Sequence, residues 1–565
     1  MNKYIIMSGL ALLSLTSCND FLDVQPEGNA TTTNYFTNDQ QSIDAIDRVY
    51  EDLPVEDMFG RNLFYEQAGA NDIVWGRTRS FNTVATLKYT GDESPLRDTF
   101  TRFYTNIARC NYIIHGLMKK GVENLTAIET RTLGEAFFER GFCHFWIAHR
   151  YGTDKLGCPF VRWEDYLPNE YDNSIPPQLP TVMDNYQMIV EDMESAMKYL
   201  PKFEEYGVSE QGRAHQAAAL GYMAKTYAYW ATWDEGKWDN VISCVDRLEN
   251  EYGRGLANSY EEVFGWDFDN FWNKEYIWSF PSNSAENGSV YGGCKLPGVM
   301  LKNHSWWVWN GNEWAGGYNG WGYIKPTNDI YEEFLKDGDR EHNPRLAYSM
   351  LSYGDVFPFF GVDMAFYDDS DLPAGFMVYK YQHQYGPADC METGIACSNG
   401  DNGMVRINFP MMRMAEMYLF RAEANLMKGN ASKATEDLNK IRTRSNLDPI
   451  SGTATMADLY HERRCELAFE YTNHLFDLKR WDRSSNAEIK ALADKELNAR
   501  PLVRVHTNRG ADFNVDDYTI EYYGDYADKA EYQPYMMTFP YPSLQIINSN
   551  GALKNLPEYP QHGSN

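Results

Sequence analysis

Residues 129–151 have the sequence ETRTLGEAFFERGFCHFWIAHRY, and this stretch decides the fold. Aromatic and aliphatic residues recur in it every three or four positions, as Phe138, Phe142 and Phe145 show. An α-helix turns once in about 3.6 residues, so residues with this spacing lie along one side of it. The stretch therefore predicts a helix that packs against other helices.

The same period continues on both sides of this stretch. It predicts helices over residues 98–118, 129–151, 180–200, 213–232, 237–250, 410–427, 431–445 and 456–481. We expect the first two, and then the next two, to pack as antiparallel pairs. Hairpins of about 34 residues with Ala and Gly at close contacts are typical of tetratricopeptide-like units. The chain should therefore be mainly α, with helical repeats over about 98–250 and 410–481.

Residues 251–409 differ in composition from the helical ranges. They have few long helical periods and many Gly, Pro, Asn and aromatic residues, with short strands expected around Tyr276–Phe280 and Phe376–Tyr381. Such insertions usually carry function while the scaffold carries stability. We therefore expect a large loop-rich insertion that carries the ligand face. Residues 502–565 form an irregular, acidic and Tyr-rich C-terminal segment, which we expect to wrap the surface.

The first 18 residues predict export and a lipid anchor. Lys3 precedes an apolar stretch from Ile5 to Leu15, about half of the ~20 residues needed to cross a bilayer. The small residues before Cys18 resemble a lipobox, so 1–17 is interpreted as a lipoprotein signal peptide, Cys18 as the acylated residue, and 18–37 as a lipidated tether. The alternative is an ordinary secretory peptide with a cysteine near its cleavage site. No later stretch has 18 consecutive apolar residues.

Charge and cysteine content exclude several functions. The chain has 80 acidic and 51 basic side chains, a formal net charge of −29, which excludes a nucleic-acid binder and disfavours polyanionic substrates. The cysteines after Cys18 form no CxxC pair, so no zinc site is predicted. Cys390 and Cys397 are close enough in sequence for a local disulfide, and buried free thiols are expected for the others.

Several motifs in order along the chain together resemble the SusD/RagB family of outer-membrane lipoproteins of Bacteroidetes. They are Cys18–Asp23, Glu135–Arg140 leading into His149–Gly152, Gly212–Ala214, Gly320–Gly322 with Pro326–Asp329, Arg413–Glu416 with Arg421–Ala424, and Glu462–Glu470 with Phe476–Trp481. The last pair, ERRCELAFE and FDLKRW, is the most specific. The chain departs from the family's pattern at Cys465 and at residues 471–474.

The resemblance implies a binding protein and not an enzyme, with no cofactor. Such proteins have four tetratricopeptide-like units and a ligand face built from irregular insertions. They cap a SusC-type TonB-dependent transporter and pass it oligosaccharides, or peptides in some members. The chain would then be surface-exposed and lipid-anchored in the outer membrane.

Residues 303–323, NHSWWVWNGNEWAGGYNGWGY, are the first candidate ligand site. They hold five Trp and two Tyr, with Val308 alone among the large aliphatic types, whereas a core segment would mix in Leu, Ile or Val. Indole faces suit pyranose rings, and polar neighbours can satisfy hydroxyl groups. The predicted ligand-binding residues are Asn303, Trp306, Trp307, Trp309, Trp314 and Tyr318. The alternative is that these tryptophans are half-buried props, which we favour for Trp321.

An early loop, Asn71–Arg77 with Arg79, is the second candidate. Because glycan-binding members of the family place an aromatic and polar groups in a comparable region, the resemblance implies that Trp75, Asp72 and Arg79 complete the site. The alternative is structural, such as an ion pair between Arg79 and Asp72.

Other chemistries have weaker support in the sequence. A glycoside hydrolase needs two carboxylates in a defined pair, and Asp267/Asp269 and Asp368/Asp369 lie in no diagnostic motif. Asp368, Asp369 and Asp371 are interpreted as a solvated turn rather than a calcium loop, because Leu372 and Pro373 do not continue an EF-hand. A peptide-binding import protein of the same fold remains the alternative function. The charged runs Glu462–Arg464 and Lys479–Arg480 are expected to form interhelical ion pairs.

Overall fold

The structure is a computed structural model that describes most of the helical ranges and part of the insertion. The described residues are 35–76, 82–165, 177–264, 272–280, 307–309, 314–316, 323–359, 362–367, 372–380, 408–472, 474–508 and 514–559. Several expectations fall outside them: those on the signal peptide 1–17, Cys18, Arg79, Asn303, Trp306, Tyr318, Asp368–Asp371, Cys390 and Cys397.

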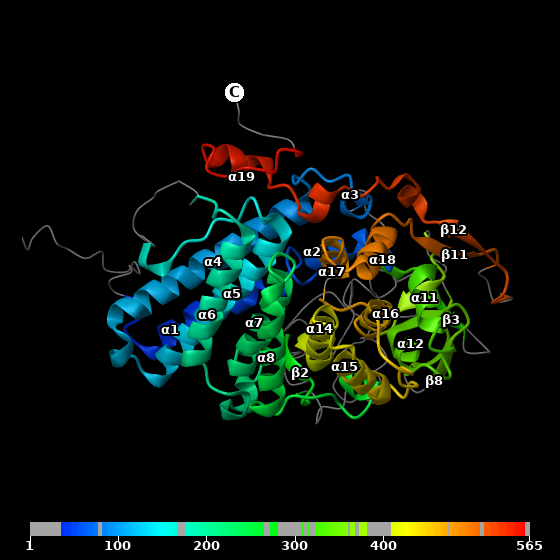
Figure 1. The fold of residues 1–565 in the computed structure, drawn as a ribbon, viewed down its shortest axis with the longest axis horizontal. Coiled ribbons are helices and arrows are strands. Elements are labelled where there is room, and N and C mark those ends of the chain that lie inside the picture. Colours follow the sequence, from blue (N-terminus) through cyan, green and yellow to red (C-terminus); the bar gives the residue numbers. More distant parts are fainter. Residues whose placement is uncertain are drawn as a thin grey trace, which may run out of the picture.

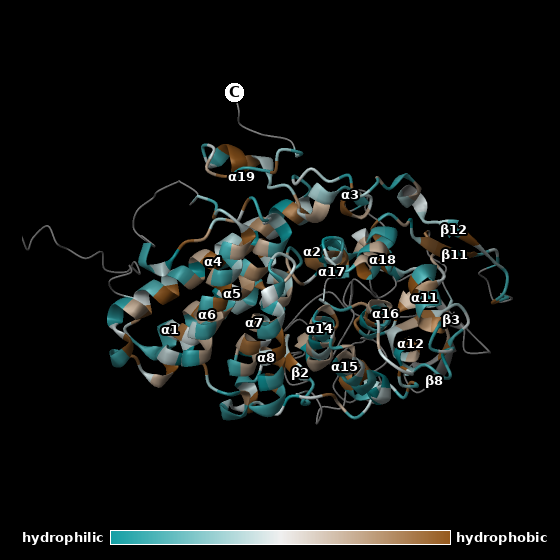
Figure 2. Ribbon diagram, viewed as in Figure 1, coloured by the Kyte–Doolittle hydropathy of each residue, from teal (hydrophilic) through white to brown (hydrophobic). Residues whose placement is uncertain are grey.

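An array of packed helices makes up the first half of the body (Figure 1). Its members are α1 (Asp39–Asp52), α4 (Ser94–Lys120), α5 (Ala127–Tyr151), α6 (Val182–Tyr199), α7 (Gln216–Trp230) and α8 (Trp238–Asn250). From α4 onward each helix packs against the next, as the two predicted hairpins require. Apolar and polar residues alternate along these helices (Figure 2), the pattern of helices that bury one side.

Helix α5 is the centre of this array. Thr126 and Glu129 form a capping box at its start, which satisfies free backbone N–H groups of the first turn. Every residue from Thr132 to Tyr151 is buried, because α1, α4, α6 and α7 surround the helix. The sequence pattern predicted one buried side, whereas α5 is buried on all sides over these residues and is a core helix.

The helical array continues after the insertion. Helices α14 (Met414–Met427) and α15 (Ala431–Arg444) form a hairpin, and α14 packs against α8 despite the insertion between them. The remaining helices of this half are α16 (Met456–Glu466), α17 (His474–Trp481) and α18 (Ala487–Leu497). The mainly helical fold with helical hairpins is thus confirmed.

One predicted helical stretch, 456–481, is divided into α16 and α17. Phe469 lies between them with a left-handed φ of 65°. Two buried cations bind carbonyl groups at and just after the end of α16. Lys380 Nζ donates to Ala468 O at 2.7 Å, and Arg413 Nη2 donates to Glu466 O at 2.7 Å. Helix C-termini favour such cations. Because these partners lie far away in sequence, the break was not visible in the local period.

The two ends of the insertion are joined by a strand pair. β2 (Tyr276–Phe280), which confirms the first predicted strand, pairs antiparallel with β10 (Phe409–Arg413). β10 leads directly into α14, so this helix begins at Met414 and not at 410 as predicted. The insertion thus leaves and rejoins the scaffold at one place.

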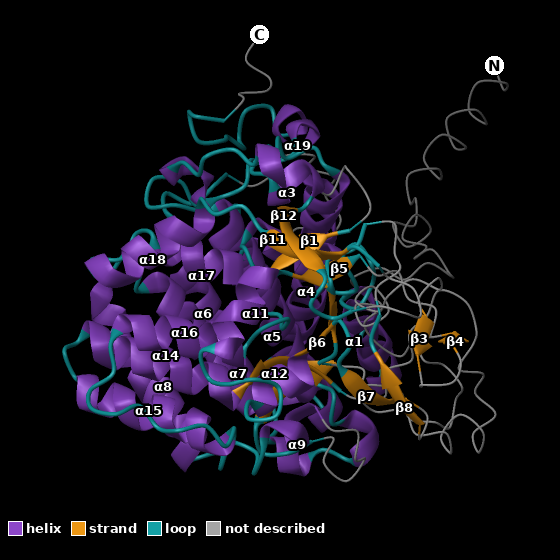
Figure 3. Ribbon diagram, turned by 90° about the vertical axis from the view of Figure 1, so that its right-hand side faces the viewer, coloured by secondary structure: helices purple, strands orange, loops and turns teal. Residues whose placement is uncertain are grey.

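The other strands gather on one side of the molecule, away from α14, α15 and α18 (Figure 3). A four-stranded sheet has the order β4 (Trp314–Gly316), β3 (Trp307–Trp309), β8 (Val362–Ala365), β7 (Val356–Phe359). The two-stranded pairs are β1 (Ile73–Trp75) with β5 (Ile324–Pro326), and β6 (Met350–Ser352) with β9 (Phe376–Val378). Short helices α11 (Asn328–Leu335) and α12 (Pro344–Ser349) lie between them in sequence.

The C-terminal segment is less superficial than predicted. It contains the pair β11 (Leu502–His506) and β12 (Tyr518–Tyr522) and helix α19 (Ser543–Asn548). Phe539 and Tyr541 are buried, and the Tyr541 ring stacks on Tyr151 with 4.9 Å between centroids. Aromatic side chains therefore draw this segment against the end of α5. None of the described helices is long and apolar enough to span a membrane.

Candidate functional site

The tryptophan-rich segment forms a β-hairpin in its described part. β3 and β4 pair with the register Trp307↔Gly316, Val308↔Ala315 and Trp309↔Trp314. Successive positions of a strand alternate between faces, and directly opposed positions share a face. Positions 307, 309 and 314 therefore fall on one face of the hairpin, and positions 308 and 315 on the other.

The two segments predicted to form the site lie side by side. β1, in the early loop, pairs with β5, which follows the tryptophan-rich segment directly. The N–H of Gly76 donates to Tyr323 O at 2.6 Å and extends this pairing into residues 303–323. The segments are far apart in sequence, so in the sequence analysis only the family resemblance indicated that they lie close together.

Trp75 does not have the predicted role. It is 1% exposed, and its ring lies 4.9 Å from that of Tyr65 and 5.0 Å from that of Tyr323. Its backbone N–H donates to the hydroxyl of Tyr526 at 2.8 Å. All three residues of β1 are buried, and Tyr526 of the C-terminal segment contacts the strand, so this indole packs the base of the loop and offers no open face to a sugar.

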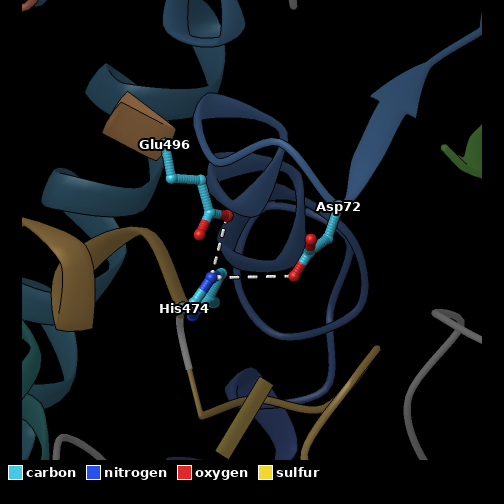
Figure 4. A group of neighbouring side chains, drawn as sticks. All are labelled: Asp72, His474 and Glu496. Carbon is cyan, nitrogen blue, oxygen red and sulfur yellow. Dashed lines mark hydrogen bonds and ion pairs between the residues drawn. The ribbon is translucent and has the colours of Figure 1, made fainter. Parts of the chain in front are cut away.

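Asp72 is also engaged internally, and its ion-pair partner among the described residues is Arg464 of α16. Arg464 Nη2 and Nε lie 2.5 Å and 2.7 Å from Asp72 Oδ1. His474 at the start of α17 lies 2.9 Å from Glu496 of α18 and 3.7 Å from Asp72 (Figure 4). All four side chains are buried. We call these residues, Asp72, Arg464, His474 and Glu496, the loop-anchoring cluster.

Charges within the loop-anchoring cluster shift one another's protonation. Burial lowers the pKa of His474, but Glu496 and Asp72 outweigh it and raise the pKa above the ordinary value. Burial raises the pKa of Glu496, but Arg464 and His474 outweigh it and hold the pKa well below its usual range. Burial raises the pKa of Asp72 and Arg464 opposes this rise. The cluster thus places two carboxyl groups beside Arg464 and an imidazole whose pKa is raised, so each buried polar group has a partner.

Among the described residues, two groups have the composition of a metal site. They are Asp72, His474 and Glu496, and Asp337, His461 and Glu462. In the first, Arg464 already supplies the cation; in the second, Arg345 Nη2 lies 2.5 Å and Arg442 Nη2 2.9 Å from Asp337 carboxylate oxygens. We therefore assign both groups to ion-pair networks.

The charged runs of the sequence form ion pairs, with one exception. Arg463 Nε lies 2.7 Å from Asp477, and Arg480 binds Glu423, which confirms the expectation for these residues. Lys479 has no carboxylate partner among the described residues; its Nζ lies 4.3 Å from the centroid of Phe539. The expectation of an ion pair at Lys479 is wrong because the C-terminal segment covers it with an aromatic ring.

The expectation of buried free thiols is confirmed for the described cysteines. They are Cys110, Cys143, Cys158, Cys244 and Cys465. Sequence reasoning missed Arg464, His474 and Glu496 as partners of Asp72. Arg464 lies in one of the motifs and His474 in the stretch that departs from the family's pattern, but nothing in their local pattern connects them with Asp72, about 400 positions earlier.

Comparisons with known proteins agree on one family. A model described as the SusD family matches residues 373–559, and one described as "Starch-binding associating with outer membrane" matches residues 20–228. A SusD-like protein of Bacteroides ovatus is 24% identical over 519 residues, which cover 88% of this chain and 84% of that protein.

Solved structures share the fold. A SusD-like protein of Bacteroides fragilis superposes with a TM-score of 0.70 at 19% identity and covers 93% of this chain and 98% of its own. A laminarin-binding SusD-like protein superposes with a TM-score of 0.67 at 19% identity, over 93% of this chain and all of its own. At these identities the likeness establishes the architecture.

Proposed function

This chain belongs to the SusD/RagB family, and from that premise we propose that it captures oligosaccharides at the cell surface and passes them to a SusC-type TonB-dependent transporter. It acts as a binding protein and catalyses no reaction. Acyl chains on Cys18 hold it on the outer membrane, and residues 18–37 tether the body to them.

The observation that carries this proposal is the register of the β3–β4 hairpin. Three of its six positions are tryptophan, and all three fall on one face. Apolar faces of pyranose rings stack on indoles, and each stacked ring contributes on the order of 1–3 kcal/mol of apolar burial. The hairpin lies in the insertion, where a rigid scaffold supports variable loops. One similar structure is that of a laminarin-binding protein, which supports a glycan as the ligand.

The net charge of −29 narrows the class of glycan. A surface with this excess of carboxylates repels sulfated or uronic-acid-rich chains over a distance of about 10 Å at moderate salt. Neutral oligosaccharides are therefore the ligands we propose.

The test uses a soluble form without residues 1–18 and a panel of neutral and anionic polysaccharides and peptides, measured by affinity electrophoresis and calorimetry. Replacing Trp307, Trp309 and Trp314 together by Ala should weaken binding of the preferred glycan at least about tenfold, since stacking area is lost. The control is Trp233→Ala, a half-exposed tryptophan outside the insertion, which should leave affinity unchanged. Unchanged affinity in the triple variant would refute the hairpin as the ligand surface.

Two further measurements separate the alternatives. Cleavage of the bound glycan during prolonged incubation would indicate a hydrolase, and binding of peptides alone would indicate the peptide-importing alternative. Co-purification of a β-barrel membrane protein with the full-length chain tests the transporter partner.

A further inference from the structure

The loop-anchoring cluster joins the ligand loops to the helical scaffold. Asp72 directly precedes β1, whereas Arg464, His474 and Glu496 come from α16, α17 and α18. Two backbone contacts continue from Asp72 toward the tryptophan-rich segment: Thr327 N–H donates to Asp72 O at 3.0 Å, and Thr327 Oγ1 donates to Asn71 O at 2.7 Å. Thr327 follows β5 and caps α11. The position of Asp72 thus determines where both strands of the β1·β5 pair lie.

Net stability is a poor explanation for this arrangement. Burying ion pairs costs several kcal/mol per ion, and their attraction roughly offsets that cost, so an apolar cluster of the same volume would stabilise the fold as well. An ion-pair cluster differs from an apolar one in its geometry. Nε and Nη2 of Arg464 both donate to Oδ1 of Asp72, which restricts the orientation of the carboxylate, whereas apolar side chains slide past one another.

We propose that Asp72, Arg464 and His474 are positioning residues of the ligand surface, which lock the β1·β5 pair, and through it the end of the tryptophan-rich segment, to the scaffold. The proposal rests on the proposed function and assigns Asp72 an indirect role in place of the ligand contact expected from the sequence. His474 lies 2.9 Å from Glu496 and 3.7 Å from Asp72 and so offsets the repulsion between the two carboxylates.

The test compares Arg464→Met, Arg464→Lys and His474→Gln with the wild type. Hydrogen exchange of peptides covering 72–76 and 323–327 reports on the β1·β5 pair without any ligand, and glycan affinity reports on the surface. In Arg464→Met and His474→Gln we expect exchange at Gly76 and Thr327 to rise about tenfold and affinity to fall about fivefold or more, while exchange in α5 stays at the wild-type rate. Arg464→Lys keeps the charge without the fork and should recover part of the protection.

The matched control is Arg140→Met, which removes another buried arginine fork. Arg140 binds Asp192 at 2.6 Å and 2.9 Å and joins α5 to α6. It should speed exchange in those helices and leave β1·β5 and affinity unchanged. Wild-type exchange at β1·β5 in folded His474→Gln and Arg464→Lys would overturn the proposal. If the wild type binds no glycan, the proposed function fails, while the exchange measurements still decide whether the cluster positions the strands.

Discussion

Nine residues, Glu462–Glu470, carry an unusual share of the buried charge. Glu466 binds Arg413 at 2.6 Å and also Arg444, and Glu470 binds Lys380 and Arg413 at 2.6 Å and 2.7 Å. Lys380 and Arg413 belong to the insertion or its boundary. These nine residues, at and just beyond the end of α16, therefore hold several separate parts of the chain together.

Glu333 gives this charge network a pH dependence. It lies 2.6 Å from His461 and 2.8 Å from Lys336. Burial raises its pKa, but the hydrogen bond from His461 and the charge of Arg464 outweigh this and lower the pKa to about 2. A carboxyl whose pKa falls on folding stabilises the protein above its unfolded pKa, near 4.3, and loses this contribution as the pH falls toward 2.

We expect the free energy of unfolding to drop by roughly 2–3 kcal/mol through Glu333 between about pH 5 and pH 2, and Glu333→Gln to remove this part of the slope. Denaturant titrations at several pH values measure it. The control is Glu332→Gln on the same helix, whose side chain is 54% exposed and which should keep the wild-type slope. An unaltered slope in Glu333→Gln would contradict the assignment.

At the scale of elements, a glycine sets the distance between α5 and α6. A Cβ atom at Gly134 would lie 2.9 Å from the backbone N of Leu200 and 3.0 Å from the carbonyl carbon of Tyr199. Ala is the better helix former by about 1 kcal/mol, but overpacking against rigid backbone costs about 1–3 kcal/mol. The steric cost should therefore equal or exceed the gain in helix propensity.

Gly134→Ala is therefore expected to lower the free energy of unfolding by up to about 2 kcal/mol, measured by denaturant titration. Gly207→Ala is the comparison, because nothing lies within 4 Å of a Cβ atom there. Equal or higher stability of Gly134→Ala would show that the helices can separate at little cost.

The helices could be predicted where their signal is local. The apolar period located α4 to α8 within a few residues. N-capping residues such as Thr126 and Thr181 mark where α5 and α6 begin, and these signals are local in the sequence. The break after α16 depends on Lys380 and Arg413, which no local window contains. Long-range partners of this kind set the elements that sequence reasoning misplaced.

The candidate site likewise has one part that the sequence predicts and one part that depends on distant residues. The concentration of tryptophan in residues 303–323 was visible in composition, and the register of β3 and β4 arranges three of these positions on one face. The burial of Trp75 depends on Tyr65, which is near it in sequence, and on Tyr323 and Tyr526, which are far along the chain. An isolated aromatic in a loop therefore says little about which way its ring faces.

At the scale of the whole molecule, attachment to the membrane is the property to test. In our proposal a single residue, Cys18, carries the lipid anchor. Cys18→Ala should move the protein from the membrane fraction to the soluble fraction, with its free energy of unfolding within about 0.5 kcal/mol of the wild type, since the body is unaltered.

Radiolabelled palmitate incorporation and fractionation of cells measure this outcome. Cys110→Ala, at a buried thiol, serves as the comparison and should remain labelled and membrane-bound. Membrane retention of unlabelled Cys18→Ala would mean that another contact, such as the transporter, suffices to hold the protein.

The pairing of β2 with β10 has a consequence for how such a protein diversifies. The chain leaves and re-enters the scaffold through neighbouring strands. The entropic cost of bringing the two ends of the intervening segment together therefore grows only slowly with its length. Insertions, deletions and exchanges between those strands should leave the helices on either side in place when they keep Lys380 and β5, which contact the scaffold. New binding specificities can thus evolve in the insertion while the helical scaffold is kept. To transfer specificity between such proteins, β2 and β10 are the boundaries at which the insertion should be exchanged.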